Sequence, residues 1–393
     1  MSRSLPPAGF PLRWADLGAG LGGFRAPEKA RRAVETALES AFPGRRARVA
    51  CSGRAALYYL LRSCREARPE RDEVALAAFT CWSVAAAAVR AGFRIRLIDL
   101  DPETYDFGTK ALGAVPWERV AAVITHHLFG LPNDRGSLAA RAEGGGAWVI
   151  DDAAQGFGAR EGGAPLGNGG AAGVLSFGRG KSLPALGGGA LLVDPRGPLS
   201  GASGTSAVGP RGAGAFLRAC AYRAFLSRGL YGAARWIPFL GIGETIYEET
   251  FRLGPLDGFT AALASRLLVG AEDRAAARRE AAAEYAAHLA GRPSLGLPAV
   301  RGGAEPAFIR FPVLVRPDRR SEVIRRAGRL GVSLSYPSPI HRIDALPKER
   351  LVPCGPLPGA ERIAASLVTL PTHPLASRAD RERIAGILLE VCA

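Results

Sequence analysis

Residues 73–98 read EVALAAFTCWSVAAAAVRAGFRIRLI, and this stretch decides the fold. Its first run, Glu73 to Ala77, predicts a buried strand, a helix-forming run follows to Ala91, and Ile95 to Ile98 predicts a second strand. A strand, a helix and a strand in this order form a unit whose two strands lie parallel in one sheet. The stretch therefore predicts an α/β protein.

The same alternation continues on both sides of this stretch. Further strands are predicted at Arg48 to Ala50, Val120 to Ile124, Trp148 to Ile150, Val174 to Phe177 and Ala190 to Val193. We expect a large domain with a mostly parallel central sheet and helices on both faces.

The pattern changes after Asp194, where Pro195 to Gly214 is rich in Gly, Ser and Pro and is typical of a loop. We divide the chain into an N-terminal segment 1–30, a large domain 31–255 and a smaller C-terminal α+β domain 256–393. An insertion at about 215–240 mixes arginines with aromatic residues. Its arginines do not share one helix face, so we expect a packed helix, with a membrane-surface helix as the alternative.

The C-terminal third begins with an alanine-rich stretch, 256–289, which predicts a long helix or a helix pair with Gly270 as its weak point. Strands are predicted at 308–315, 332–336 and 367–370, and helices at 321–330 and from Arg378 onward.

Charge and cysteine content exclude several classes of protein. The net charge is +15, but the arginines are scattered and form no basic block or zinc-finger pattern, so we expect no nucleic-acid partner. The six cysteines form no CxxC pair and no cluster with histidine, so neither a metal site nor a disulfide framework is expected. The N-terminal residues include prolines and charges where a signal peptide would need an apolar core, and the most apolar uncharged run, Val74 to Val89, is too short to span a membrane. We therefore expect a soluble, cytoplasmic protein.

Lys181 is one of four lysines in a chain whose basic residues are otherwise all arginine. A desolvated lysine can lose its proton and attack a carbonyl group, whereas arginine stays protonated. An isolated loop lysine is ordinarily a surface residue, so its neighbours in the sequence decide between the two interpretations.

Two acids follow a predicted strand in the segment 148–155, WVIDDAAQ. Ligands of open α/β sheets bind beyond the carboxyl ends of the strands, where a carboxylate can hold a cationic ring nitrogen. An aspartate before Ala-Ala is also a common helix N-cap. Asp151 and Asp152 can therefore divide these two tasks.

Two glycine-containing turns complete the pattern. Residues 51–57, CSGRAAL, predict a turn at the start of a helix, where free backbone N–H groups favour a phosphate. Ser176 stands at a strand end five residues before Lys181, and Gly187-Gly188-Gly189 permits a close backbone approach or an unusual dihedral angle. Together these segments describe a Schiff-base lysine, an acid for a pyridinium nitrogen and a phosphate-binding turn.

In these segments the chain resembles the sugar aminotransferases of the DegT/DnrJ/StrS type, which are pyridoxal-phosphate (PLP) enzymes of fold type I. The resemblance runs from about Arg48 to the C-terminus. Its segments include CSGRAAL, HHLFGLPNDR, VIDDAAQGFGA, LSFGRGKSLPALGGGALLV and LVTLPTHPLASRADRERI, besides the stretch quoted first. It implies a homodimer whose active sites lie at the interface.

The resemblance implies a role for each matching position. Lys181 forms the Schiff base with PLP and later carries the proton between the substrate carbon and the cofactor. Asp152 pairs with the pyridinium nitrogen. Gln155 lies near the phenolic oxygen of the ring. The phosphate is held by Ser176 and by Gly53 with Arg54.

The chain also departs from the family pattern. Cys81 stands where the family has an aromatic residue that stacks on the ring, so Trp82, one residue later, is the stacking candidate. The acid that usually follows the lysine is missing at Gly187. The family asparagine that reaches the partner subunit's phosphate aligns near Leu253, and Arg252 is a candidate substitute.

Three further residues match positions near the substrate: His127, Tyr336 and His341. For His127 the alternative is a histidine that packs beneath its loop, and His373 is expected to be structural. The implied function is transfer of an amino group from an amino acid, glutamate, to a keto-sugar carried on a nucleotide. The alternatives are a sugar dehydratase, whose relatives have histidine in place of the lysine, a non-catalytic regulatory protein, and a transferase for a lipid-linked or other non-nucleotide acceptor.

Overall fold

The computed structural model describes residues 4–203, 210–226 and 246–393. An eight-stranded sheet forms its centre, in the order β1-β9-β8-β5-β4-β2-β3-β12. Its strands are β1 (Arg46–Ala50), β2 (Glu73–Ala77), β3 (Arg94–Ile98), β4 (Val120–Ile124), β5 (Trp148–Asp152), β8 (Ala172–Ser176), β9 (Gly189–Val193) and β12 (Leu351–Pro353). Neighbouring strands in this sheet are parallel except where β9 pairs with β1 and β8, because β9 runs in the opposite direction.

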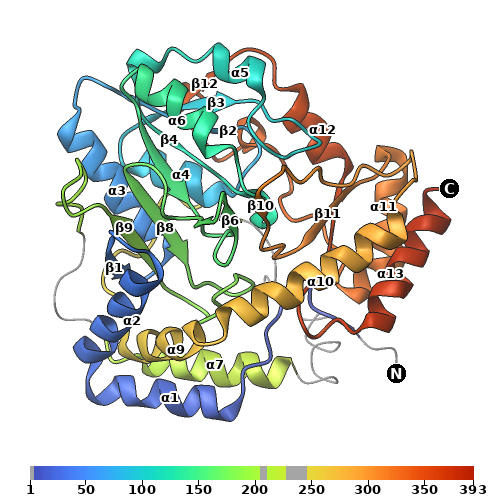
Figure 1. Ribbon diagram of the computed structural model, residues 1–393, viewed down its shortest axis with the longest axis horizontal. Coiled ribbons are helices and arrows are strands. Elements are labelled where there is room, and N and C mark those ends of the chain that lie inside the picture. Colours follow the sequence, from blue (N-terminus) through green and yellow to red (C-terminus); the bar gives the residue numbers. More distant parts are fainter. Residues whose placement is uncertain (1–3, 204–209, 227–245) are drawn as a thin grey trace.

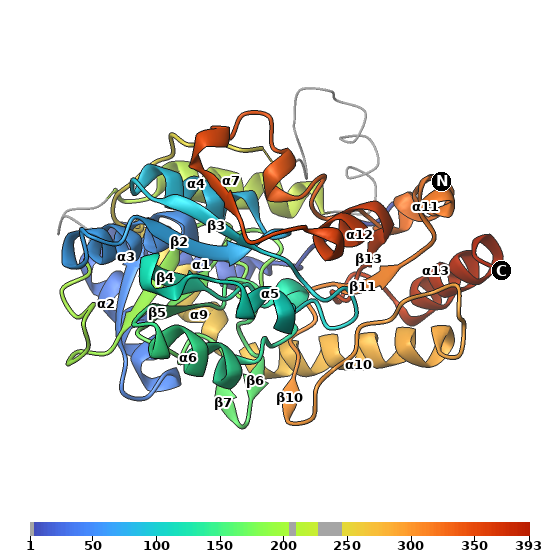
Figure 2. The same cartoon turned by 90° about the horizontal axis from the view of Figure 1, so that it is seen from above.

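Helices cover both faces of this sheet. The first half of the chain forms α1 (Trp14–Arg25), α2 (Pro27–Ala41), α3 (Gly53–Ala67), α4 (Trp82–Arg90), α5 (Thr109–Gly113) and α6 (Arg135–Gly144). Figure 2 shows α3 and α4 on one side of the sheet and α6 on the other. The alanines of α4 from Ala85 to Ala88 are completely buried, because small side chains let this helix lie close to the strands. The α/β class and the mostly parallel sheet are confirmed.

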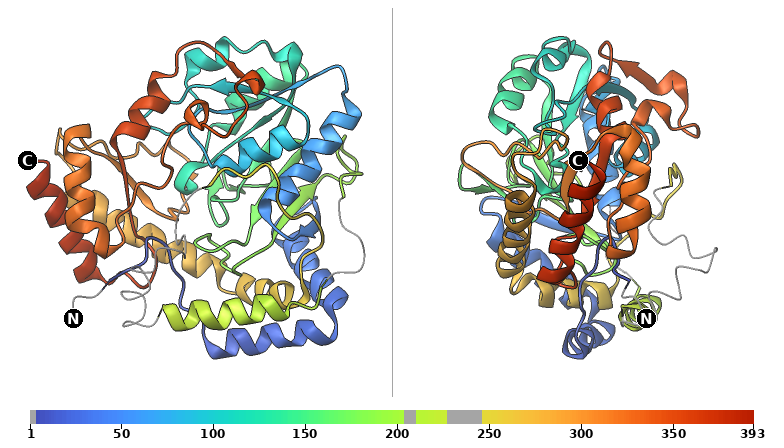
Figure 3. Two further views of the ribbon diagram at one scale, coloured as in Figure 1. Left: turned by 180° about the vertical axis from the view of Figure 1, so that it is seen from behind. Right: turned by 90° about the vertical axis from the view of Figure 1, so that its right-hand side faces the viewer.

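The later part of the chain forms α7 (Ala213–Phe225), α9 (Gly258–Leu268), α10 (Ala271–Leu289), α11 (Pro317–Ala327), α12 (Pro358–Ser366) and α13 (Arg378–Val391). Figure 1 shows α10 leaving the base of the sheet, where α1, α7 and α9 lie, and reaching the C-terminal helices. There α13 packs against α10 and α11, and α11 also contacts a small antiparallel sheet of β11 (Phe311–Leu314) and β13 (Leu367–Leu370) (Figure 3).

A third, short sheet joins β6 (Arg160–Glu161) to both β7 (Ala164–Pro165) and β10 (Ala304–Glu305). The chain after residue 256 thus contributes to three sheets, since β12 also pairs with β3 at the edge of the central one.

Several predicted elements of the C-terminal third have different forms in the structure. The alanine-rich stretch is a helix pair, broken at Gly270, whose φ of 75° lies in the left-handed region. The predicted strand at 332–336 is wrong: Ser333 makes one isolated bridge to Thr369, and a φ of 70° at Ser335 ends the extended run. The strand β12 was not predicted, because it has only three residues and ends in proline.

The insertion begins with α7, which packs against α1 and α9. Tyr222 accepts a hydrogen bond from the Phe10 N–H at 3.0 Å, and the Arg223 guanidinium lies 4.5 Å from the Trp14 ring centre. Up to Leu226 this is the packed helix that was expected; the remainder of the predicted insertion, 227–240, lies outside the described residues. Within the described residues, no helix combines the length and apolar character needed to cross a membrane.

Candidate active site

The start of α3 forms one wall of a pocket at the carboxyl end of the sheet. Ser52 caps the helix by accepting a hydrogen bond from the Ala55 N–H at 3.0 Å. Gly53 lies against Ser176, so close that a Cβ added to Gly53 would be 2.8 Å from the Ser176 Cβ. Both residues line the pocket, so the backbone N–H groups of the first turn and the Ser176 hydroxyl meet there.

The glycine run brings β9 against this turn. Gly188 has a φ of 86° and donates its N–H to the Cys51 carbonyl at 3.1 Å. A Cβ on Gly189 would be 2.4 Å from the Gly53 nitrogen. The prediction that these glycines allow a close backbone approach and an unusual dihedral angle is confirmed.

The two aspartates of β5 have opposite surroundings. Asp151 is completely buried and accepts hydrogen bonds from His127 (2.6 Å), Arg135 (3.0 Å) and the N–H groups of Gly167 and Gly169 (2.8 and 2.9 Å). Asp152 instead lines the pocket, and its Oδ1 accepts the Ala154 N–H at 2.9 Å.

The pKa values of the two carboxyls move in opposite directions. Burial raises the pKa of Asp151, but the nearby His127 and Arg135 outweigh it and bring that pKa well below its usual range. For Asp152 burial dominates and raises the pKa, although the Ala154 N–H and the Lys181 ammonium oppose it. Burial thus disfavours the ionised form of Asp152, and a cationic group placed in the pocket would stabilise that form.

Lys181 enters the same pocket from the turn that follows β8. The turn is closed by a hydrogen bond from the Lys181 N–H to the Gly178 carbonyl at 3.1 Å. The Lys181 side chain lines the pocket together with Asp152, Ser176 and Gly53. The structure thus brings an amine, a buried carboxylate and a helix N-terminus to one place.

Gln155 also lines the pocket and is fixed at both ends. Its Oε1 accepts the Phe129 N–H at 3.2 Å, and its Nε2 donates to the Tyr336 hydroxyl at 3.1 Å. The Tyr336 ring meets Phe79 edge-on, with ring centres 5.8 Å apart. Tyr336, from the C-terminal part, is therefore tied to the rim of this pocket.

Arg54 lines the pocket, but its guanidinium is engaged outside it. Its Nη1 donates to the Glu248 carbonyl at 3.2 Å and lies 3.6 Å from the Glu248 carboxylate. The same guanidinium lies 5.1 Å from the Phe251 ring centre.

Four of the predicted site residues do not line the pocket: Tyr336, which contacts Gln155 as described above, and Trp82, His127 and His341. The Trp82 indole donates to the Ser338 carbonyl at 3.1 Å, and Cys81 lines the pocket in its place. His127 is completely buried beneath its loop, held by Asp151 and by the Asn133 N–H at 2.9 Å. His341 bonds to Glu361 at 2.7 Å, away from the pocket lining.

Several lining residues were not predicted as site residues: Thr80, Cys81, Ser83, His126 and Ala154. All of them lie shortly after a strand or at the start of a helix, within two residues of a predicted site residue. His126 is held by a 2.7 Å hydrogen bond to the Tyr105 carbonyl, and burial lowers its pKa to about 3, so the ring stays neutral near pH 7. Their position shortly after a buried strand could have identified them from the sequence, because ligands of open α/β sheets bind beyond the carboxyl ends of the strands.

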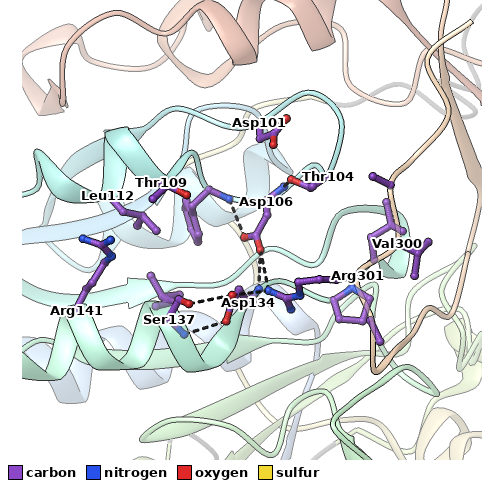
Figure 4. A pocket seen from close by; sticks show the side chains of 16 residues that line it. Asp101, Thr104, Asp106, Thr109, Leu112, Asp134, Ser137, Arg141, Val300 and Arg301 are labelled. Atoms are coloured by element: carbon purple, nitrogen blue, oxygen red, sulfur yellow. Dashed lines mark hydrogen bonds and ion pairs between the residues drawn. The ribbon is translucent and has the colours of Figure 1, made fainter.

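A second cavity lies beyond the loops that follow β3 and β4 (Figure 4). Arg301 crosses it and binds Asp134 at 2.7 Å and Glu161 at 2.6 Å, with Asp106 3.9 Å away. None of the predicted site residues lines this cavity. Within the part of the chain that the structure describes, no group of three or more His, Cys, Asp or Glu is placed to hold a metal ion.

The sheet order, with one antiparallel strand, and the lysine and carboxylate at its carboxyl edge define the class of α/β proteins with the PLP-transferase fold of type I. Residues 24–197 and 251–389 match the model of the DegT/DnrJ/EryC1/StrS aminotransferase family, and the chain belongs to that family.

Individual relatives and solved structures agree with this assignment. A UDP-N-acetyl-3-dehydro-alpha-D-glucosamine 3-aminotransferase of Acidithiobacillus ferrooxidans is 27% identical over 317 residues, which cover 81% of this chain and 77% of that protein. A dTDP-3-amino-3,4,6-trideoxy-alpha-D-glucose transaminase of Streptomyces venezuelae is 30% identical over 274 residues, 69% of this chain and 64% of that protein. The crystal structure of the sugar aminotransferase CalS13 from Micromonospora echinospora shares the fold, with a TM-score of 0.74, 23% identity and coverage of 98% and 99%.

Proposed function

We propose that this protein is a PLP-dependent aminotransferase that moves an amino group from an amino acid, glutamate, to a keto-sugar carried on a nucleotide. The observation that carries the proposal is the convergence of Lys181, Asp152 and the start of α3 on one pocket. Family membership and relatives that act on UDP- and dTDP-linked sugars support the substrate class.

The residues of the pocket fit PLP. A buried carboxylate whose pKa is raised by desolvation matches a pyridinium nitrogen, because a cation beside it would stabilise its ionised form. A helix N-terminus without a Cβ at Gly53, beside a serine hydroxyl, matches a phosphate. A lysine amine between them matches an aldehyde.

When bound, PLP supplies an electron sink for the carbanion that forms at the substrate carbon. Asp152 would hold a proton on the ring nitrogen, and Ser176 with the N–H groups of Gly53 and Arg54 would hold the phosphate. Gln155, fixed by Phe129 and Tyr336, would orient the ring through its phenolic oxygen. Lys181 would bind the cofactor and then move the proton at its Nζ to and from the substrate carbon.

We further propose a cytoplasmic homodimer. All six cysteines are free thiols, as in proteins of a reducing compartment. The segment that carries Arg252 borders the phosphate-binding turn, because the Cys51 thiol donates to the Arg252 carbonyl at 3.2 Å. In a dimer the Arg252 guanidinium would serve the partner's phosphate in place of the missing asparagine.

The deciding experiment compares Lys181→Ala with native protein after reconstitution with PLP. Native protein should show the visible absorption band of a lysine–PLP linkage, and glutamate with a keto-sugar nucleotide should yield 2-oxoglutarate. Lys181→Ala should lose both, while the matched control Lys110→Ala, at an exposed lysine of α5, should keep both.

Native protein that stays colourless with excess PLP would contradict the proposal. Native protein that binds PLP but reacts with no amino acid would instead favour a regulatory role.

A further inference from the structure

Arg278 is a buried cation that forms no ion pair with any carboxylate in the described part of the chain. It lies on α10, its side chain is only 4% exposed, and it faces the underside of the Lys181 turn. Across residues 4–203, 210–226 and 246–393, none of the groups whose charges act on its guanidinium is a carboxylate. A desolvated charge without an opposite partner is costly to folding.

Arg278 contacts the backbone of the candidate catalytic lysine and the side chain of the next residue. Its Nη1 donates to the Ser182 hydroxyl at 3.1 Å, and its Nη2 donates to the main-chain carbonyl of Lys181 at 3.4 Å. The planar guanidinium thus bridges two successive residues of the turn, a geometry that a lysine ammonium cannot reproduce.

The opposite side of the turn is closed by the N-terminal segment. Gly180 has a φ of 82°, and a Cβ added to it would be 2.8 Å from the Ala8 Cβ. The turn therefore sits between Ala8 and the α10 helix and has little room to shift. Since α10 also carries Tyr285, whose hydroxyl donates to the Pro371 carbonyl at 3.2 Å, the same helix is bonded to the C-terminal part.

We propose that Arg278 is a positioning residue that fixes the backbone of Lys181 and Ser182, so that the Lys181 amine stays directed at the Asp152 side of the pocket. The inference rests on the proposed function of Lys181. Arg278 lines no part of the pocket itself and acts through the turn.

Four variants test this proposal: Arg278→Met, Arg278→Lys, Ser182→Ala and the double variant Arg278→Met with Ser182→Ala. The matched control is Arg279→Met, whose side chain donates to the Gly158 carbonyl and does not touch the turn. Each PLP-loaded protein is examined by circular dichroism of the visible PLP band, by the rate and donor KM of the amino-acid half-reaction, and by thermal unfolding.

We expect Arg278→Met to slow the half-reaction by about 10- to 100-fold with an unchanged donor KM, because a misplaced reacting group reduces rate more than binding. The visible dichroism should change, while the unfolding temperature should be kept or raised, because a desolvated charge is removed. Arg278→Lys should recover part of the rate. Ser182→Ala should have a smaller effect, and none in the Arg278→Met background.

Unchanged dichroism and rate in Arg278→Met would overturn the inference, whatever its unfolding temperature. If Arg278→Met does not fold, Arg278→Lys and Ser182→Ala decide by the same two readouts. A native protein without the PLP band overturns the proposed function and this inference together, whereas a normal native band with insensitive variants overturns the inference alone.

Discussion

At the scale of single residues, Asp151 and Asp152 show how the surroundings assign a task to a side chain. They are neighbours on β5, and strand geometry directs successive side chains to opposite faces. Asp151 accepts hydrogen bonds from Arg135, His127 and two backbone N–H groups, so its two oxygens are occupied by contacts within the fold. Asp152 lines the pocket, where its carboxylate can bind a ligand.

Substitution of each acid by asparagine should separate the two tasks. Asp151→Asn removes the buried charge shared by Arg135 and His127, although Arg135 keeps Glu161, and should lower the free energy of unfolding by about 3–5 kcal/mol in urea titrations. Asp152→Asn should leave that free energy unchanged or higher but slow transamination roughly 10²- to 10³-fold. Equal loss of stability in the two variants would contradict the division.

His373 should make folding depend on pH. It is buried, its Nε2 donates to the Pro6 carbonyl at 2.9 Å, and burial lowers its pKa from 6.5 to about 4, helped by the charges of Arg278 and Arg310. Between those pH values the unfolded chain binds a proton that the folded protein refuses, so stability is lost as the pH falls from about 6.5 towards 4.

The expected loss from His373 is about 3 kcal/mol over this window, at about 1.4 kcal/mol per pKa unit. It is measured as the difference in unfolding free energy between native protein and His373→Gln at pH 7 and pH 4. His288→Gln, at an exposed position of α10, should show no such difference. A His373→Gln variant that tracks native protein at both pH values would refute the assignment.

The pocket residues that could be predicted from the sequence are those whose backbone position alone determines their direction. Four pocket residues follow strands or begin a helix, and they therefore lie together at the carboxyl edge of the sheet: Gly53, Asp152, Ser176 and Lys181. Trp82, His127 and His341 depend instead on which way a side chain turns. That direction is set by partners such as Ser338, Asp151 and Glu361, which lie far away in the sequence or across the sheet.

At the scale of elements, the closest backbone approach in the site is between β9 and the start of α3. Gly189→Ala would place a Cβ against the Gly53 main chain, so backbone must move. We expect a loss of about 1–3 kcal/mol in unfolding free energy and weaker PLP binding in equilibrium dialysis. Gly187→Ala is the control, because nothing lies within 4 Å of its added Cβ. Equal PLP affinity in both variants would exclude this packing role.

Most elements could be predicted because each carries its own pattern. The strands β2, β4 and β13 have the predicted bounds, since each is a short apolar run between turn residues. The prediction of a strand at 332–336 was wrong because the pattern of apolar residues does not reveal the left-handed backbone of Ser335. The edge strand β12 owes its form to pairing with β3, which local sequence does not encode.

At the scale of the whole molecule, Asp99 joins the central sheet to the C-terminal part. Its carboxylate follows β3 and accepts the first N–H groups of α12, from Gly359 and Ala360 at 2.9 and 2.8 Å. Asp99→Ala should lower the free energy of unfolding by about 1–3 kcal/mol, because these donors lose their acceptor. Glu103→Ala, at an exposed position nearby, should not, and calorimetry distinguishes the two.

The pairing of β12 with β3 also has a consequence for biosynthesis. The ribosome synthesises β3 long before Leu351–Pro353. Until β12 has been made, the β3 edge of the central sheet has no strand paired to it. Uncovered edges recruit other chains, and expression of the first 255 residues alone should therefore give aggregates where the full chain stays dispersed. Completion of the sheet is thus coupled to completion of translation.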